Sequence, residues 1–222
     1  MKTSDVYNRF ILKSEKNGTN DNVSTSKERF VELYNEYQIR YAEFIIGNKN
    51  TDTIRYVESI LVKDRLLKDP VKNKEYYSFK LPENYLDLSS AYALGSKGKC
   101  RNKKINLFIE SMKDDKDLYL SDSFTEPSFE FRESLFDLSS GMINIYYTDF
   151  ELDSASVSYY RYPNKITLIN PENPESDFDD TVEIDFDEKA INKIITASVS
   201  GFDMNNNSQR WELNNPFAKK DL

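Results

Sequence analysis

The residue types that most often carry catalysis are scarce in this chain. It contains no histidine and a single cysteine, Cys100. Histidine is the usual general base near neutral pH, the usual partner of a serine or cysteine nucleophile and the commonest ligand of transition metals. Zinc is nearly excluded too, because it binds through histidines or clustered cysteines. Any catalysis would have to rely on carboxylates, lysine, tyrosine or a hard metal ion.

The segment Ala93–Cys100 (ALGSKGKC) comes close to a phosphate-binding P-loop. That motif combines glycine backbone N–H groups, a lysine and a hydroxyl. Here Ala93 stands where the motif has its first glycine, and Cys100 stands where it has the magnesium-binding hydroxyl. We therefore interpret the segment as a solvated turn and expect neither a nucleotide nor any other cofactor.

A basic cluster overlaps this segment. Five of the eight residues from Lys97 to Lys104 are basic, in a chain whose net charge is −8. Two interpretations are open: contact with a phosphate backbone or an acidic partner, or a solvated loop. The candidate contact residues are Lys97, Lys99, Arg101, Lys103 and Lys104.

An acidic cluster lies near the C-terminus. The stretch Glu172–Glu188 carries nine carboxylates and no basic residue. Carboxylates bind calcium and magnesium, but the spacing of a calcium loop is absent. Glu183 and Asp185 alternate with apolar residues, which predicts a strand over 182–186 with a solvated acidic face. The stretch Asp203–Asn207 matches the first ligands of a calcium loop but lacks its glycine and its closing glutamate. We expect no metal site.

Helical spacing dominates the sequence after residue 26. Thr25 and Glu28 form a capping-box pattern, and apolar residues then recur at helical spacing as far as Gly47. A second helix is predicted to end at Asp69-Pro70. The short connection between the two favours an antiparallel helical hairpin over residues 27–68.

The rest of the chain indicates short strands and one late helix. Residues 76–186 contain several extended, β-branched and aromatic segments, interrupted by a short helix that Pro82 begins and Gly95 ends. Residues 187–199 form a helix, and residues 1–26 and 201–222 are an arm and a tail. The fold class is therefore α+β: a helical hairpin, a small antiparallel β region, a late helix and extended terminal arms on one domain over 27–200.

Aromatic residues suggest contacts with other chains. The chain has 15 tyrosines and 14 phenylalanines, and such rings tolerate partly wet surfaces. Tyr37 and Tyr41 belong to a wide stripe that the second helix covers only in part, so a neighbouring subunit and the chain's own core remain alternatives. Trp211 and Phe217 are isolated large aromatics in the polar tail and are candidate anchors, either on a partner or on their own domain.

Composition also limits the setting. No apolar run approaches the roughly 20 residues that span a bilayer, and no secretory signal is visible. The lone cysteine excludes internal disulfides and fits a reducing compartment. The acidic balance argues against general coating of nucleic acid or an anionic membrane.

Three segments occur together in an informative order: LPENYL at Leu81–Leu86, EPSFEFRE at Glu126–Glu133, and YYRYPNKI at Tyr159–Ile166. With the helical hairpin, they resemble the neck or tail-adaptor ring proteins of tailed bacteriophages, particularly crAss-like phages infecting gut Bacteroidota. The resemblance covers about residues 25–200 and leaves both tails unmatched.

The resemblance implies a structural virion protein without enzyme activity. Such proteins form a homo-oligomeric ring beneath the portal, often with twelve-fold symmetry, contact the portal and other neck or tail proteins, and let the genomic DNA pass without sequence-specific binding. The expected location is the virion neck, after assembly in the bacterial cytoplasm. Two alternatives remain open: a small monomeric phage-encoded module that binds a host protein, and a hydrolase based on two carboxylates.

Overall fold

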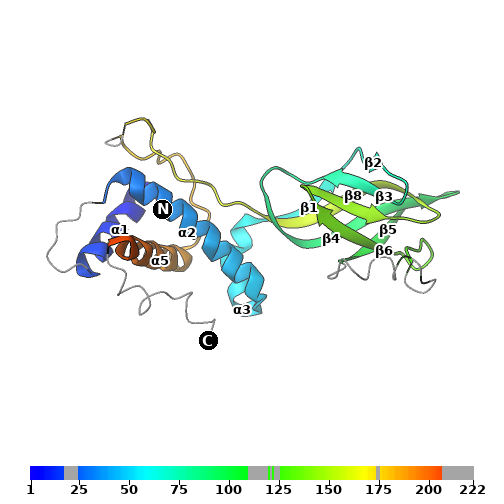
Figure 1. The fold of residues 1–222 in the computed structure, drawn as a ribbon, viewed down its shortest axis with the longest axis horizontal. Coiled ribbons are helices and arrows are strands. Elements are labelled where there is room, and N and C mark those ends of the chain that lie inside the picture. Colours follow the sequence, from blue (N-terminus) through cyan, green and yellow to red (C-terminus); the bar gives the residue numbers. More distant parts are fainter. Residues whose placement is uncertain (18–24, 110–119, 121, 123–125, 174–175, 207–222) are drawn as a thin grey trace. The chain divides into compact units, whose positions relative to one another are not determined.

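The computed structural model describes residues 1–17, 25–109, 120, 122, 126–173 and 176–206. The chain divides into two compact units (Figure 1). The helical unit combines Met1–Ile60 with the chain from Tyr162 onward, and the β unit is Leu61–Arg161. The chain therefore leaves the helical unit once, forms the whole β unit, and returns.

The helical unit is built around one long helix, α2, which packs against α5, while α5 also packs against α1 (Figure 1). Its core is aromatic, and the rings of Phe10, Phe30 and Tyr34 are fully buried in it. The helices are α1 (Thr3–Asn17), α2 (Lys27–Asn48), α3 (Thr51–Ile54), the 3-10 helix η1 (Arg55–Ile60) and α5 (Glu188–Asn206).

Local signals fix the ends of α2. Ser26 is the N-cap, and its side chain accepts a hydrogen bond from the backbone N–H of Arg29 at 3.2 Å. Lys49 ends the helix in the left-handed conformation, with a φ of 47°. The predicted helix is thus confirmed, with its cap one residue beyond Thr25.

The β unit is a single eight-stranded sheet in the order β1-β8-β4-β5-β6-β7-β3-β2. Neighbouring strands are antiparallel except β5 and β6, which are parallel. The strands are β1 (Leu61–Leu67), β2 (Val71–Lys72), β3 (Tyr76–Lys80), β4 (Tyr85–Lys97), β5 (Cys100–Ile109), β6 (Glu133–Ser139), β7 (Met142–Tyr146) and β8 (Glu151–Arg161).

The connection between β1 and β2 requires the sheet to curl. These strands are the two outer edges of the sheet, yet only residues 68–70 separate them in sequence. So short a link spans at most about 15 Å. The two edges must therefore approach each other where β1 ends and β2 begins, and the sheet takes the form of a half-barrel.

Curling lets the sheet bury one of its own faces. The side chains that alternate inward from β3, β7 and β8 form one core cluster with residues of the connecting turns. Phe79, Ile143 and Val157 are completely buried within it. A sheet curled in this way packs its inward side chains against one another, as in small barrels.

The expectation of a helical hairpin with a small β region is wrong. About 35% of the described residues are in strands, and the sheet has eight strands. The second helix of the hairpin is only α3 and η1, and β1 begins at Leu61. The pairing of β1 with β8 shifts between Val62 and Arg65, where Asp64 has a φ of 51°. This bulge breaks the alternation expected of a strand, so the apolar spacing resembles that of a helix.

The short helix predicted after Pro82 is also wrong, because that segment contains β4. The register of β4 with β8 shifts at three points along its length. Each shift moves the following side chains to the opposite face, so a single alternating pattern is lost. Alanine, as at Ala91 and Ala93, also has little preference for strands.

The strand predicted over residues 182–186 is absent, since this segment is irregular, with bends at Val182 and Phe186, and pairs with no strand. It lies against the helices, and the Phe186 ring meets Tyr41 of α2 edge-on at 5.9 Å. Phe186 is buried, while Val182, Ile184 and Asp185 are half-buried and Glu183 is exposed. The sequence pattern therefore predicted the burial of Phe186 correctly, but the acidic face is only partly solvated and the predicted pairing is wrong.

Other predictions agree with the structure or are extended by it. The predicted strands near residues 77–81, 105–109, 142–147 and 157–162 correspond to β3, β5, β7 and β8, and the late helix to α5. The N-terminal arm differs, because Thr3–Asn17 is the helix α1. The structure also divides the single domain expected over 27–200 between the two units. Residues 18–24 of the arm and 207–222 of the tail lie outside the described residues.

Candidate functional site

The basic cluster forms the hairpin between β4 and β5. Lys97 pairs with Cys100 across the turn, and Gly98 takes a left-handed φ of 56° that favours glycine. A strand follows the turn where a P-loop would continue into a helix. The segment is therefore a hairpin turn, and its geometry does not form a phosphate cradle.

Some of these cations are held against the chain itself. Lys97 donates to the Asp149 carboxylate, and this contact raises the pKa of Lys97 and lowers that of Asp149. The ammonium groups of Lys103 and Lys104 lie over aromatic rings, 4.7 Å from the Phe129 centroid and 4.2 Å from that of Tyr92.

Lys99 and Arg101 are exposed at the tip of the hairpin, as is Cys100, and Lys104 is exposed further along β5. Lys97 and Lys103 are half-buried, so three of the five basic residues are fully presented to solvent.

The turn before β6 presents an exposed aromatic ring. Phe131 is 77% exposed, whereas Phe129, two residues earlier, is buried in the core of the β unit. Backbone hydrogen bonds in both directions join Ser128 and Glu133, at 2.9 and 3.1 Å, and the Ser128 hydroxyl accepts from the N–H of Phe131 at 3.3 Å. The turn is closed on both sides of Phe131.

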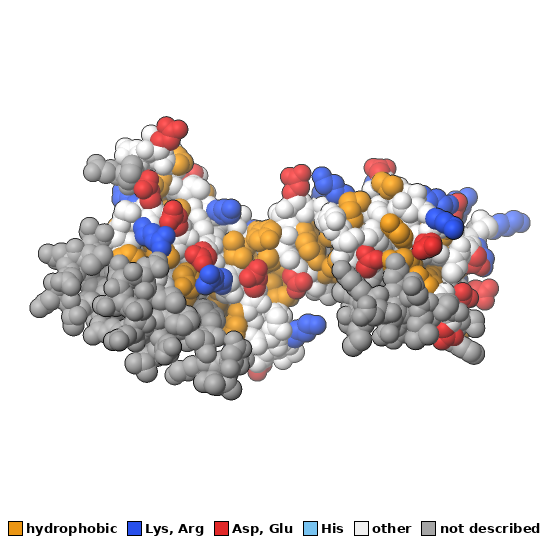
Figure 2. Space-filling view, in the orientation of Figure 1, with side chains coloured by type: hydrophobic (Ala, Val, Ile, Leu, Met, Phe, Trp, Pro, Cys, Tyr) orange, Lys and Arg blue, Asp and Glu red, His pale blue; other side chains and the backbone are white. Residues whose placement is uncertain are grey.

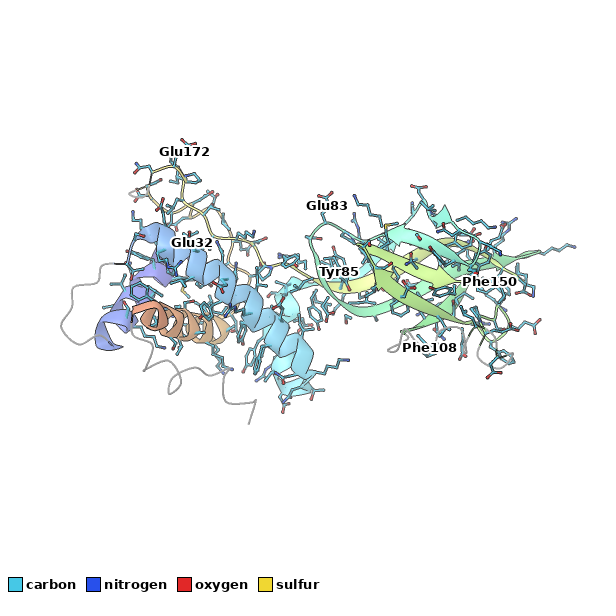
Figure 3. The ribbon with its side chains drawn as sticks, in the orientation of Figure 1. Glu32, Glu83, Tyr85, Phe108, Phe150 and Glu172 are labelled. Carbon is cyan, nitrogen blue, oxygen red and sulfur yellow. The ribbon has the colours of Figure 1, made fainter. Side chains whose placement is uncertain are left out.

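The same turn is fastened to the sheet. The carbonyl of Arg132, a residue with a φ of 61°, accepts the backbone N–H of Asn106 in β5 at 2.8 Å. Phe108, further along β5, is 50% exposed and lies at the lower margin of the sheet in Figure 3. Apolar side chains also show between charged ones on the visible face of the β unit (Figure 2). Phe108 on β5 and Phe131 in the turn before the adjacent strand β6 are therefore both exposed aromatic side chains.

A polar network crosses β6, β7 and β3 on the face away from the core. The Asn144 side chain donates to Asp137 at 2.7 Å and to Ser139 at 2.8 Å, and it accepts from Ser78 at 2.7 Å. The second oxygen of Asp137 accepts the Tyr146 hydroxyl at 2.5 Å. A carboxylate beside a phenol could transfer protons, but each oxygen of Asp137 already has a donor. The network is closed, and it ties three strands together.

The stripe tyrosines of α2 have different environments. Tyr41 is 1% exposed and packs on Phe186, and its hydroxyl has no hydrogen-bond partner within the described part of the chain. Burial, with a smaller contribution from the negative charge of Asp187, raises the pKa of Tyr41 to about 12. Tyr41 is therefore part of the core of the helical unit.

Tyr37 is partly buried and lies on the face of α2 toward α5. A Cβ atom built on Gly201 would overlap the Tyr37 hydroxyl and come within 2.6 Å of ring carbon Cζ. Arg40 lies over the outer side of the ring, 5.4 Å from its centroid. Burial raises the pKa of Tyr37. The ring is thus enclosed on one side by α5 and on the other by an exposed arginine.

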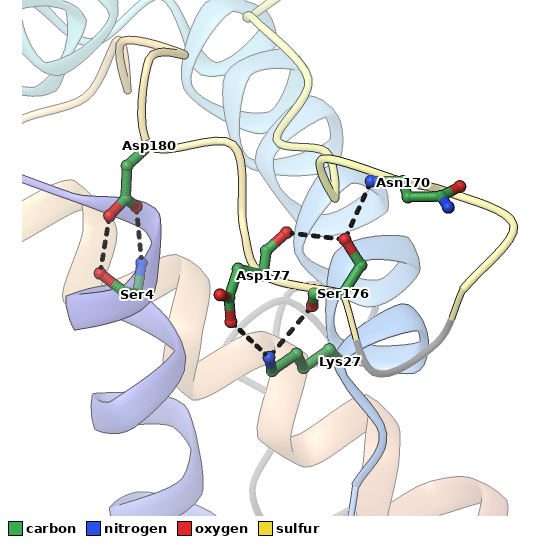
Figure 4. Close-up of polar contacts among 6 residues, drawn as sticks. All are labelled: Ser4, Lys27, Asn170, Ser176, Asp177 and Asp180. Carbon is green, nitrogen blue, oxygen red and sulfur yellow. Dashed lines mark hydrogen bonds and ion pairs between the residues drawn. The ribbon is translucent and has the colours of Figure 1, made fainter.

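Carboxylates of the acidic stretch bond to residues at the starts of α1, α2 and α5. Residues 170–173 and 176–187, here called the strap, lie beside the starts of α1 and α2 (Figure 4). Asp180 accepts from the backbone N–H of Ser4 at 3.2 Å and from its hydroxyl at 3.1 Å, at the start of α1. Asp187 accepts from the N–H of Ala190 at 2.7 Å, at the start of α5. Carboxylates at helix N-termini stabilise the unpaired N–H groups and the helix dipole.

The strap also holds the start of α2. The Lys27 ammonium donates to the Asp177 carboxylate at 3.1 Å and to the Ser176 carbonyl at 3.0 Å. No group of three acidic, histidine or cysteine side chains suited to a metal ion occurs among the residues whose placement is described. The first residues of the calcium-like stretch, 203–206, belong to the last turn of α5.

The remaining predicted anchors, Trp211 and Phe217, lie outside the described residues. In the described part, no helix is long and apolar enough to cross a membrane. Phe131 is the functional candidate that sequence reasoning missed, although it lies within the EPSFEFRE segment. Its spacing from Phe129 gave no signal, because residues two apart in an extended segment are expected to face the same side. In comparisons with known proteins, no family model matches the chain and no curated protein matches it significantly.

Proposed function

We propose that this protein is a structural subunit that assembles through the Phe131 turn into a ring in the neck of a tailed bacteriophage. The observation that carries the proposal is the Phe131 ring, which is 77% exposed on a turn that hydrogen bonds close on both sides. Such a ring fits the role of an interface anchor. The resemblance of three segments to neck proteins, one of which contains Phe131, supports the proposed location.

A side chain on a fixed turn binds with a smaller loss of conformational entropy than one on a flexible loop. Interface hot spots are enriched in large side chains that fill a pocket on the partner. Ordering a flexible loop on binding opposes association, whereas a loop already fixed in its bound shape loses little entropy. Phe131 combines a large exposed apolar area with a fixed backbone. Phe108, half exposed on the adjoining strand, would extend the same interface.

The use made of the acidic residues supports a structural role. Asp177, Asp180 and Asp187 stabilise helix ends, and both oxygens of Asp137 are bonded across the sheet. A ring requires heterologous contacts, in which one surface of a subunit meets a different surface of the next. The net charge of −8 would repel DNA phosphates in the channel and let the genome pass. The portal and the adjacent neck proteins are the proposed partners.

A matched pair of variants tests the anchor. Phe131→Ser should leave the thermal midpoint nearly unchanged, because the ring is exposed, but it should weaken assembly at least about tenfold, as loss of an interface anchor does. Ile169→Ser is the control, since Ile169 is 68% exposed but lies in the helical unit. Sedimentation velocity across a concentration series, with and without the portal, measures assembly. Equal assembly by the two variants would rule out the anchor.

The same turn also fits a second function, a small monomeric module that binds a bacterial host protein. A single presented aromatic can insert into a pocket on any partner and does not require a second copy of this chain. The two functions differ in mass. The module would stay at 26.0 kDa at every concentration, alone and with the portal, and it would lose host-protein binding on Phe131→Ser.

A further inference from the structure

The exposed large apolar side chains of the β unit, within its described residues, fall into two pairs. Leu66 near the end of β1 is 44% exposed and Val71 at the start of β2 is 59% exposed. These two residues flank the short link 68–70 and are here called the seam patch. Phe108 and Phe131 form the second pair, here called the aromatic patch. Exposed apolar patches mark surfaces that bind other molecules.

The seam patch lies on the outer face of the sheet. Leu66 pairs with Ser156, whereas its neighbour Leu67 belongs to the core of the β unit. Successive side chains of a strand point to opposite faces, so Leu66 points away from the core. Val71 pairs with Ser78, whose hydroxyl belongs to the polar network on that same outer face.

The two patches lie on opposite sides of the curled sheet. β5 and β6 hold the two middle places in the strand order, whereas β1 and β2 are its edges. Because the edges approach each other at residues 68–70, the middle strands lie across the sheet from them. β2 accordingly lies along the upper margin of the β unit in Figure 1, and Phe108 lies at the lower margin in Figure 3.

The surroundings of the two patches carry opposite charge. The EPSFEFRE segment, which contains Phe131, has three glutamates and one arginine, and all four are exposed. Leu61–Lys72, which contains the seam patch, has four basic and two acidic residues, and all six are exposed. Complementary charges around an interface steer association and fix its register.

We propose that the aromatic patch of each subunit docks on the seam patch of the next, so that Phe131 packs against Leu66 and Val71. The proposal rests on the proposed function, because it names the surface that receives the Phe131 turn. A patch docked on its own kind would bring like charges together, which opposes closed dimers. Docking of the two different patches, on opposite sides of each subunit, gives the heterologous contact that a ring needs.

A double-mutant cycle tests the apolar contact, with assembly of the full chain measured by sedimentation velocity with and without the portal. Phe131→Ser and the pair Leu66→Ser with Val71→Ser should each weaken assembly at least about tenfold. The chain with all three changes should assemble little worse than either variant, because each removes the same contact. Losses that add up would overturn the contact. Unchanged thermal midpoints show that the variants fold, as expected for exposed side chains.

Charge reversal tests the pairing independently. Glu130→Lys with Glu133→Lys reverses one rim, and Arg65→Glu with Lys68→Glu reverses the other. Each pair should weaken assembly about tenfold, since like charges then meet across the contact. An equal mixture of the two variants, or one chain with all four changes, should recover assembly to within about threefold of the unaltered chain.

Glu83→Lys with Asp87→Lys is the matched control, because these exposed carboxylates lie in neither patch; it should assemble as the unaltered chain does. If the unaltered chain forms a ring but the combined reversal fails to restore assembly, or neither reversal weakens it, the pairing of the patches is overturned and the ring stands. If the unaltered chain stays at 26.0 kDa alone and with the portal, both the pairing and the proposed function are overturned.

Discussion

At the scale of single residues, two tyrosine hydroxyls in the helical unit predict opposite effects on stability, because one is hydrogen-bonded and the other is not. Tyr34 is fully buried on α2, and its hydroxyl has no partner among the described residues. Burial, with a smaller contribution from Asp185, raises the pKa of Tyr34. An unpaired buried hydroxyl costs about 1–3 kcal/mol, so Tyr34→Phe should raise the free energy of unfolding by about 1 kcal/mol.

The matched control for that substitution is Tyr7→Phe. Tyr7 also packs against Phe30, but its hydroxyl donates to the Thr25 carbonyl at 3.0 Å. Loss of this hydrogen bond should lower the free energy of unfolding by about 0.5–1.5 kcal/mol. Urea denaturation followed by circular dichroism measures both. If the two variants change stability in the same direction, the assignment of the Tyr34 hydroxyl is wrong.

A second residue-scale prediction concerns glycine. Gly201→Ala places a methyl group in the space of the Tyr37 ring, and such overpacking typically costs about 1–3 kcal/mol. Gly47→Ala is the control, because nothing lies within 4 Å of a Cβ built on Gly47 in α2. It should stabilise the helix by up to about 1 kcal/mol. Combining Gly201→Ala with Tyr37→Ala should recover part of the loss, and additive losses in the double variant would contradict the contact.

At the scale of elements, the strap is the part most open to test. Asp180→Ala removes the carboxylate that caps α1, and losing a cap costs about 0.5–2 kcal/mol. Glu172→Ala is the control, because Glu172 is exposed at the outer end of the strap (Figure 3). Amide exchange in α1 should become faster in Asp180→Ala and stay unchanged in Glu172→Ala. Unchanged exchange in both would show that the strap does not stabilise α1.

Elements whose pattern is uninterrupted could be predicted from the sequence. Strands β3 and β7 are short, unbroken runs rich in β-branched and aromatic residues, and α5 has continuous helical spacing. Bulges concealed β1 and β4, since a bulge moves the following side chains to the other face. The strap was mistaken for a strand for another reason: its apolar residues alternate because one side packs against the helices, although the segment pairs with no strand. Helix α1 was missed, although Val6 and Phe10 are spaced one helical turn apart.

At the scale of the whole molecule, the sheet could not be predicted from local patterns. Its order brings together strands that are far apart in sequence, such as β1 with β8 and β3 with β7. Strand pairing over such separations depends on side-chain packing across the sheet, which no short window of sequence contains. The basic residues of the candidate site were visible as a cluster, but their contacts with Asp149, Phe129 and Tyr92 depend on which strands and turns lie beside the hairpin.

The proposed assembly is tested most directly by electron cryo-microscopy of the purified chain mixed with the portal protein of the proposed phage. The account predicts a closed ring of this protein, coaxial with the portal and with a symmetry matching it, in which the Phe131 turn of each subunit contacts the next. Particles that show the portal alone, while this chain remains a 26.0 kDa monomer, would contradict the account.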